Sequence, residues 1–466
     1  MNQDEIKKRV TKCFKGNDIR CLYFKELNEE LAYLTARALI SLYKYKKVFI
    51  GRDMRFSSDP LANAFMKGVC DQGADVIDLG MTDTPMIYFA SGKYKKPGAM
   101  ITASHNTLDF NGIKLVKPGA KPIGKNTGIN KIKALVLKNK FKDAKKKGKI
   151  MKKDLFQQYR KFVLSIINKK NLKPLKIVVD AGNGMAGKII PIVFKSLPFK
   201  IIPLDFKISK KNPLNEANPA VFKNLRDVQI RVKKEKADFG MAFDSDMDRV
   251  FFVDEKGKII NASIIGSLII KNYIGKKKNV NLLYSLICSK IVHETIKKYK
   301  EVPVRARVGH SLIKKQMRDK KAPFGVERSG HFYYSNNYYA DSGIITSLIV
   351  SEIVSKSNLP FSKLIKEFDK YYKSEEKSIK ASMCKHVLKN IEAIYKKRKP
   401  KVIDYFDGLF IGFQDFWFSV RQSQTESYLR INMEANTRKT LDKELKKLLS
   451  IAKRKNIRFC RIHPLV

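Results

Sequence analysis

The amino-acid sequence predicts an α/β protein in which three similar α/β units precede a smaller C-terminal α+β domain. Helix and strand patterns alternate three times along the chain, and short strands dominate its last part. The chain has 466 residues, which is enough for several domains. We therefore expect domains at 1–150, 151–254, 255–372 and 373–466.

The first unit alternates helices with strands. Asn28 is a candidate cap for a helix whose apolar face carries Leu31, Leu34, Leu39 and Leu42. A second helix is expected at 60–71, and the expected strands lie at 48–50, 75–79, 98–101 and 113–116. Such alternation is typical of a largely parallel sheet. The lysine-rich residues 136–153 are interpreted as a mobile boundary between domains.

The second unit begins with an amphipathic helix at 154–167 and a strand at 176–180. Gly182, Gly184 and Gly187 follow this strand and fit the pattern GxGxxG, which occurs in dinucleotide-binding turns. The pattern is short and common by chance. We interpret it as a tight turn between strand and helix.

The rest of the chain contains a third α/β unit and the α+β domain. In the third unit, strands are expected at 281–287 and 302–308, and helices are expected through His293, from Ser311 and at 344–354. In the last domain, the expected elements are strands at 409–413, 417–421 and 428–434 and helices at 388–397 and 441–453. This change of pattern marks the last domain as a separate α+β unit.

The composition limits the classes of function. The sequence has 95 Lys and Arg residues against 44 Asp and Glu residues, which gives a formal charge of +51. This charge attracts phosphorylated molecules. Lysine far outnumbers arginine, however, whereas specific recognition of nucleic-acid bases favours arginine. We expect a phosphorylated small molecule as the partner, and no specific nucleic acid.

The six cysteines are scattered without CxxC spacing. This distribution argues against a zinc site and a disulfide framework, and it favours a reducing compartment. The first ten residues lack the apolar core of a signal peptide, and no run of about 18 apolar residues predicts a membrane span. We expect a cytoplasmic protein without membrane contact, either a monomer or a homodimer.

A candidate nucleophile follows the short apolar run at 98–101. Residues 102–106 read Thr-Ala-Ser-His-Asn, which places Ser104 and His105 at the end of a buried strand. A hydroxyl in such a position is held rigidly and can still be reached. A serine hydroxyl needs a neighbouring base, a metal or a phosphate to take part in chemistry. The alternative is an ordinary Ser/Thr-rich turn.

A candidate metal site follows the strand expected at 238–243. Asp244, Asp246 and Asp248 alternate along a loop and present hard oxygen ligands that suit Mg²⁺ or Ca²⁺. Three uncompensated carboxylates so close together would repel one another without a cation. An EF-hand is excluded because Arg249 occupies its glycine position and 250–253 is expected to be a strand. The pair Asp244 and Asp246 also fits the aspartyl-phosphate motif of a phosphatase.

Two further loops carry groups that suit a phosphorylated sugar. Residues 325–331 place Glu327, Ser329 and His331 between glycines, and such donors and acceptors match sugar hydroxyls. Gly309 and His310 lie at a junction between strand and helix, where the imidazole can act as an acid or base.

A third loop, 421–427, offers Arg421 together with hydroxyls and amides as an anion site. A plain polar hairpin would not need an arginine at the mouth of the loop. Arg20 and Arg52 occupy comparable loop positions near the N-terminus.

These clusters, in this order, resemble the α-D-phosphohexomutase family, and the closest branch is phosphomannomutase/phosphoglucomutase. The resemblance covers nearly the whole chain. The matching stretches begin at Asp18, Gly51, Ser57, Thr84, Thr102, Asn111, Asp244, Gly309, Glu327, Asp341 and Arg421. The resemblance implies four domains, three of them α/β domains with mixed sheets, around a central cleft.

The resemblance also implies a reaction. A phosphoryl group moves between C1 and C6 of mannose or glucose phosphate, through a phosphoserine at Ser104 and a hexose 1,6-bisphosphate intermediate. Mg²⁺ is implied as the cofactor, bound by Ser104 phosphate and the three aspartates. The implied proton-transfer residues are Lys114, Arg249 and His310. The implied substrate contacts are Arg20, His105, Gly309, Glu327, Ser329, His331, Arg421, Ser423, Gln424 and Thr425.

Several positions depart from the family pattern. Thr107 stands where proline is usual, so the serine loop is expected to be less rigid. Arg328 stands where methionine or glutamine is common. Ser245, Gln422, Gln424, Ser427, Cys21 and Asn17 are further departures. None of these changes removes an obligatory group.

Three alternatives remain open on the sequence. A phosphoglucosamine mutase is favoured by Arg328 and the altered sugar loop. A phosphatase that uses Asp244 would leave the serine stretch without a role. A non-catalytic relative that binds polyanions is favoured by the charge of +51.

Overall fold

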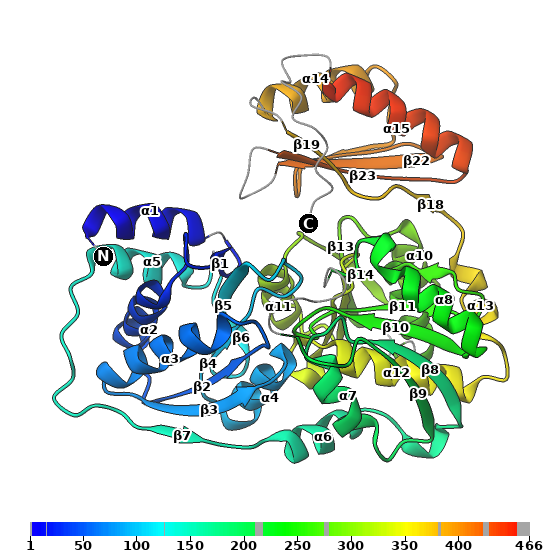
Figure 1. The fold of residues 1–466 in the computed structure, drawn as a ribbon. Helices are drawn as coiled ribbons and strands as arrows, with labels where there is room; N and C mark the ends of the chain where they lie inside the picture. Colours follow the sequence, from blue (N-terminus) through cyan, green and yellow to red (C-terminus); the bar gives the residue numbers. More distant parts are fainter. Residues whose placement is uncertain are drawn as a thin grey trace.

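The computed structural model describes residues 2–14, 16–124, 126–209, 218–274, 279–380, 384–422 and 428–453. The chain forms four domains, each built on one sheet (Figure 1). The first domain, in blue and cyan, lies beside the second and third domains, and the fourth domain lies above the third.

The first domain is built on a seven-stranded sheet in the order β1-β5-β4-β2-β3-β7, with β6 paired to β5. Its strands are β1 (Ile19–Leu22), β2 (Lys47–Arg52), β3 (Asp75–Met81), β4 (Gly98–Ile101), β5 (Phe110–Lys117), β6 (Lys121–Pro122) and β7 (Ile150–Lys152). Its helices are α1 (Gln3–Cys13), α2 (Glu29–Tyr43), α3 (Ser58–Asp71), α4 (Thr84–Tyr94) and α5 (Ile129–Lys138). Strands β4, β2, β3 and β7 are parallel, whereas β5 runs antiparallel to β1, β4 and β6, so the sheet is mixed and only part of it is parallel as alternation predicts.

Two details of the first domain test the sequence analysis directly. Asn28 caps α2 as predicted, because its Oδ1 accepts a hydrogen bond from Leu31 N at 3.0 Å. The mobile boundary at 136–153 is wrong in part: β7 pairs with β3, and Lys147 Nζ lies 2.8 Å from Asp71 Oδ1. The lysine side chains of this segment are largely exposed, while the backbone at 150–152 adds a strand to the sheet. A run of charged residues does not by itself indicate such a strand.

The second and third domains repeat one topology. The second sheet has the order β12-β11-β10-β8-β9 and the third has β14-β13-β15-β16-β17. The second domain contains α6 (Phe156–Leu164), β8 (Leu175–Asp180), α7 (Ala186–Phe194), β9 (Phe199–Leu204), α8 (Arg226–Glu235), β10 (Phe239–Phe243), β11 (Val250–Asp254) and β12 (Ile259–Ile260). The third contains α9 (Ala262–Ile269), β13 (Asn281–Ser285), α10 (Lys290–Lys298), β14 (Val302–Ala306), α11 (His310–Asp319), β15 (Phe324–Val326), β16 (Phe332–Tyr334), β17 (Ala340–Asp341), α12 (Gly343–Lys356) and α13 (Phe361–Leu364).

In both sheets three parallel strands are followed by two antiparallel ones. Strands β3, β2, β4, β5 and β1 of the first sheet have the same arrangement. The prediction of three similar α/β domains is therefore confirmed by topology. The second sheet reaches β12, beyond residue 254.

The equivalent loop of each sheet carries a predicted functional stretch. This loop joins the third parallel strand to the antiparallel strand beside it. In the three sheets it contains Ser104 (β4 to β5), Asp244 (β10 to β11) and Glu327 (β15 to β16). The same loop of a repeated topology therefore carries a hydroxyl in the first domain, aspartates in the second and a glutamate in the third.

The glycine pattern after β8 is a tight turn, as interpreted. A Cβ on Gly184 would lie 2.8 Å from Ser245 Cα, and a Cβ on Gly187 would lie 2.1 Å from Phe206 O. Met185 N donates to Ser245 O at 2.9 Å. The glycines let the turn pack against the loop that carries the aspartates.

The fourth domain has a six-stranded sheet in the order β18-β23-β22-β21-β20, with β19 paired to β23. Its elements are β18 (Tyr372–Lys373), β19 (Lys377–Lys380), α14 (Cys384–Lys396), β20 (Val402–Asp404), β21 (Leu409–Gly412), β22 (Phe416–Gln422), β23 (Tyr428–Ala435) and α15 (Arg438–Lys453). Its apolar core is separate from the large core that the first three domains share. Within the described ranges, every helix is too short or too polar to cross a bilayer.

Asp83 lies at the contact between the first and second domains and is fully buried. It caps α4 and accepts a hydrogen bond from Tyr159 OH of α6 at 2.9 Å. Burial raises the pKa of the Asp83 carboxyl from 3.8 to about 7. Only the unfolded chain then releases this proton between these two values, so wild-type stability decreases as pH rises from about 4 to 7.

We predict that Asp83→Asn removes this pH dependence. The free energy of unfolding of Asp83→Asn minus that of wild type should increase by up to about 4 kcal/mol as pH rises from about 4 to 7. Above about pH 7 this difference should level off. Urea unfolding at several pH values measures this difference. Asp154→Asn is a matched control, because exposed Asp154 also accepts a hydrogen bond from a backbone N–H, that of Phe156. A difference for Asp83→Asn that stays flat between pH 5 and 8 would contradict the prediction.

Candidate functional site

The Ser104 hydroxyl lies at the end of β4 and is almost completely buried. Ser104 has φ of 52°, in the left-handed region that side chains other than glycine rarely adopt. Its N–H donates to Thr102 Oγ1 at 2.9 Å. The loop therefore imposes a local strain that the surrounding contacts must balance.

Arg55 supplies most of those contacts, and the sequence analysis missed it. The side chain is 1 % exposed, and its Nε donates to Asp53 Oδ2 at 3.1 Å. Its other nitrogens donate to four carbonyls of the serine loop: Ser104 O (2.6 Å), Asn106 O (2.7 Å), Thr107 O (2.5 Å) and Phe110 O (3.0 Å). Arg55 thus restrains the loop that lacks the usual proline. The available signal was a second arginine just beyond Arg52 and Asp53.

The serine hydroxyl meets the acidic loop of the second domain. Ser104 Oγ donates to Asp244 Oδ2 at 2.7 Å. Arg249 Nε donates to the same oxygen at 2.8 Å, and Arg249 N donates to Asp244 Oδ1 at 3.1 Å. Burial raises the pKa of Asp244 to about 7 although Arg249 favours its ionised form. Two loops 140 residues apart therefore form one site.

Lys114 joins the other two aspartates. Its Nζ donates to Asp246 Oδ2 at 2.6 Å and to Asp248 Oδ2 at 2.5 Å, and all three side chains are buried. Thr84 of α4 donates to Asp246 as well. Lys114 of β5 and Arg249 of the acidic loop therefore balance part of the charge of the three carboxylates.

The acidic loop also fits a divalent cation. The carboxylates of Asp244, Asp246 and Asp248 offer oxygens within 4.8 Å of one another. Asp246 Oδ1 is buried without a hydrogen-bond partner among the described residues, and Asp248 Oδ1 has only the longer contacts with His331 Nε2 at 3.4 Å and Arg249 Nε at 3.9 Å. Buried anionic oxygens without donors are costly, and hard cations bind such oxygens. The donor set therefore suits Mg²⁺.

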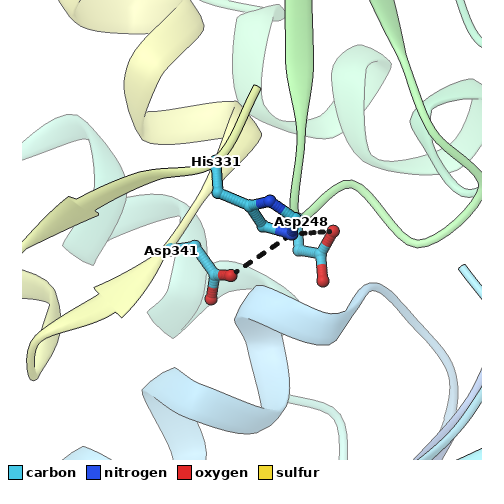
Figure 2. Close-up of side chains that lie close together, drawn as sticks. All are labelled: Asp248, His331 and Asp341. Carbon is cyan, nitrogen blue, oxygen red and sulfur yellow. Dashed lines mark ion pairs between the residues drawn. The ribbon is translucent and has the colours of Figure 1, made fainter. Parts of the chain in front are cut away.

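His331 lies between two acids on the other side of this cluster. Figure 2 shows its ring between Asp248 and Asp341. Its Nε2 lies 3.4 Å from Asp248 Oδ1 and 3.7 Å from Asp341 Oδ2. Burial lowers the pKa of His331, but Asp248, Asp341 and Glu327 outweigh it, so the net pKa is raised.

The predicted sugar loop is arranged around His331. Ser329 Oγ lies 3.0 Å from His331 Nδ1. Glu327 accepts hydrogen bonds from Gly309 N at 3.1 Å and Tyr333 OH at 2.6 Å. The structure thus brings the 309–310 loop and the 325–331 loop together.

The other two predicted histidines are held neutral. Burial lowers the pKa of His310 strongly, and Lys314 and Lys114 lower it further. Burial lowers the pKa of His105 strongly as well, and Arg249 and Arg20 lower it further. His105 Nδ1 lies 3.3 Å from Ser104 Oγ.

Both ring nitrogens of His310 are buried without a partner among the described residues. The rings of His310 and His331 are 6.5 Å apart. A neutral imidazole with free nitrogens can accept or donate a proton.

Asp341 and Lys314 are further groups that the candidate list lacked. Lys314 Nζ lies 2.6 Å from Asp341 Oδ1 and donates to Tyr88 OH at 2.8 Å. Asp341 had been noted only as the start of a matching stretch. Lys314 carried no signal, because lysine is common throughout this sequence.

Arg20 joins the serine loop, and Arg421 lies apart from it. Arg20 Nη1 donates to Asn106 Oδ1 at 2.9 Å and its Nη2 to Asp18 Oδ2 at 2.6 Å. Arg421 belongs to β22 of the fourth domain. The predicted contacts Ser423, Gln424 and Thr425 lie outside the described residues.

Family models match most of the chain. The phosphoglucomutase/phosphomannomutase alpha/beta/alpha domain I matches residues 11–143, domain II matches 156–257 and domain III matches 261–371. The three matches follow one another in the order of the three repeated sheets.

Characterised relatives extend over nearly the full length. A phosphomannomutase from Vibrio cholerae is 35% identical over 91% of this chain and 94% of its own, and one from Escherichia coli is 34% identical over 92% and 95%. The crystal structure of a phosphoglucomutase/phosphomannomutase family protein from Burkholderia thailandensis aligns with a TM-score of 0.87 at 27% identity, covering 96% of this chain and 98% of that one. The chain belongs to the phosphoglucomutase/phosphomannomutase family of α-D-phosphohexomutases.

Proposed function

We propose that this protein is a phosphohexomutase that moves a phosphoryl group reversibly between C1 and C6 of mannose or glucose phosphate. The contact between Ser104 Oγ and Asp244 Oδ2, at 2.7 Å, carries this proposal. It joins the candidate phosphoryl carrier to the candidate metal loop. The names of the relatives, which are phosphomannomutases, support mannose phosphates as the first substrate to test.

In the proposed cycle, Ser104 carries a phosphoryl group at rest. The P–O bond to Ser104 breaks as a new bond forms to the free hydroxyl of the hexose monophosphate, which gives a hexose 1,6-bisphosphate. The bisphosphate turns over, and its other phosphoryl group returns to Ser104. Each half-reaction needs positioning and charge neutralisation above all.

Asp244, Asp246 and Asp248 are proposed to hold Mg²⁺ together with the phosphate on Ser104. When bound, Mg²⁺ supplies positive charge against the transferring phosphoryl group. Lys114 and Arg249 add fixed positive charge beside the same acids. His105, next to Ser104, is proposed to contact the transferring phosphate.

Proton transfer is assigned to the histidine side of the site. The substrate hydroxyl must lose a proton as it attacks, and Ser104 Oγ must gain one when the phosphoryl group leaves. His310 is neutral, and its two ring nitrogens have no hydrogen-bond partner among the described residues. It can therefore accept a proton from the substrate hydroxyl or donate one in the reverse step. Lys114 and Arg249 stabilise the charge that develops.

The sugar and the distant phosphate are assigned to the remaining residues. Glu327 and Ser329 can bind sugar hydroxyls beside His331, and Gly309 positions Glu327 through its backbone N–H. Arg20 is proposed as a second cation near the transferring phosphate. Arg421, with Ser423, Gln424 and Thr425, is proposed to bind the phosphate that does not react.

We also propose that the domains end near residues 150, 254 and 372, and that the protein works in the cytoplasm as a monomer or homodimer. The five cysteines of the described part are buried and form no disulfide with one another, which supports a reducing compartment; they are Cys13, Cys21, Cys70, Cys288 and Cys384.

Replacing Ser104 by alanine should lower mutase activity by several orders of magnitude, because it removes the proposed carrier of the phosphoryl group. A coupled assay with mannose 1-phosphate and glucose 1-phosphate measures this loss. Intact-mass analysis should show one extra phosphate on wild type and none on Ser104→Ala. Activity within about tenfold of wild type would remove the phosphoserine mechanism.

Removal of divalent cations should stop turnover and leave the fold intact, because Lys114 and Arg249 already balance part of the acidic charge. We expect activity to disappear in EDTA and to return with excess Mg²⁺. The melting temperature should fall by only a few degrees, which corresponds to a loss of about 1 kcal/mol in the free energy of unfolding. Asp246→Asn should weaken the response to Mg²⁺. Full activity after chelation would argue against a metal site.

Arg55→Lys should lower kcat by about tenfold or more and leave KM nearly unchanged. Lysine cannot donate to four carbonyls in the planar arrangement that restrains Ser104. Arg9→Lys is the matched control, since Arg9 donates to a single carbonyl, Phe24 O, far along the chain from the serine loop. A wild-type kcat in Arg55→Lys would show that the serine loop keeps its conformation without the hydrogen bonds from the Arg55 guanidinium.

A further inference from the structure

Arg421 is held between two carboxylates of its own domain. Its Nη2 donates to Glu376 Oε2 at 3.4 Å, and its Nη1 lies 3.8 Å from Asp407 Oδ2. Its Nε is buried and lacks a hydrogen-bond partner among the described residues. The carboxylates therefore orient the guanidinium while one of its donors stays available.

The Glu376 side of this arrangement continues to the third domain. Glu376 Oε2 accepts a hydrogen bond from Asn432 Nδ2 at 2.9 Å, and Arg430 donates to Oε1 at 3.1 Å. Arg328 donates to Asn432 Oδ1 and, at 2.6 Å, to Ser374 O. An arginine of the 325–331 loop thus reaches Arg421 through two intermediate side chains.

The Asp407 side also continues to the third domain. Asp407 Oδ2 accepts a hydrogen bond from Val308 N at 2.9 Å. Val308 precedes Gly309, whose N–H donates to Glu327 at 3.1 Å. Both carboxylates that orient Arg421 are therefore tied to the pair of loops that holds Glu327.

We infer that Arg328, Glu376 and Asp407 are positioning residues that set the separation between Arg421 and the sugar-binding loop at Glu327 and Ser329. The inference rests on the proposed function, in which Arg421 binds the phosphate that does not react. A hexose phosphate has a fixed length between its hydroxyls and its phosphate. Holding both contacts at that separation before binding lowers the ordering cost of binding.

Arg328 brings a positive charge and two donors to this network, and neither methionine nor glutamine can donate to two acceptors with a positive charge. Another contact between the third and fourth domains uses none of the residues named above. Lys290 Nζ donates to Asn436 Oδ1 at 2.7 Å.

The test compares two substitutions of the same type at one interface. Arg328→Met should raise KM for mannose 1-phosphate by about tenfold or more, the loss expected for a charge-assisted hydrogen bond, while kcat stays within about twofold. Lys290→Met should leave both constants near wild type. Both variants should melt at similar temperatures, because each loses interdomain hydrogen bonds.

Glu376→Gln provides a second variant that keeps the side-chain volume and an acceptor for Asn432 but removes the charge. It should raise KM in the same way. An unchanged KM in both Arg328→Met and Glu376→Gln, or an equal increase in Lys290→Met, would overturn the inference.

Arg421→Met separates failure of the inference from failure of the proposed function. If Arg421→Met leaves KM unchanged, the proposed phosphate contact is wrong, and the inference is overturned with it. If Arg421→Met raises KM while Arg328→Met and Glu376→Gln do not, only the positioning role is wrong.

Discussion

The buried ion pairs of Lys114 with Asp246 and Asp248 fix the geometry on which the site depends. Lys114 belongs to the first domain and the acids to the second, so these contacts set the relative position of the two domains. Leaving one charge of such a pair unpartnered costs about 3–5 kcal/mol. This cost restricts the domains to arrangements in which Ser104 Oγ stays close to Asp244.

The repeated topology explains how one site collects groups from three domains. Ser104, Asp244 and Glu327 all lie in the loop between the third parallel strand and its antiparallel neighbour. Each strand ends in a rigid position because it is buried in its sheet. The three loops face one another, and together they form a polar centre within a large apolar core.

Much of this arrangement could be predicted from the sequence, because strands that end in chemically distinctive loops are visible in it. The three α/β units and the Asn28 cap follow from local patterns, whereas the grouping of Ser104 with the aspartates was implied by the resemblance to the α-D-phosphohexomutase family. The role of Arg55 could not be predicted, since its four acceptors are backbone carbonyls that no residue type identifies. Strand β7 was missed because it is only three residues long and follows a lysine-rich stretch, so no residue pattern indicates its backbone pairing with β3.

The charge balance of the site connects the basic composition with the proposed chemistry. Three aspartates face Lys114 and Arg249, which leaves one net negative charge in that cluster at neutral pH when all five groups are ionised. A divalent cation would change this balance to one net positive charge, which suits a phosphoryl group in transfer. The surrounding field of a chain with a formal charge of +51 draws phosphorylated sugars toward the protein. The acids therefore offset the positive charge of Lys114 and Arg249 at the centre of the site, although the chain as a whole is strongly basic.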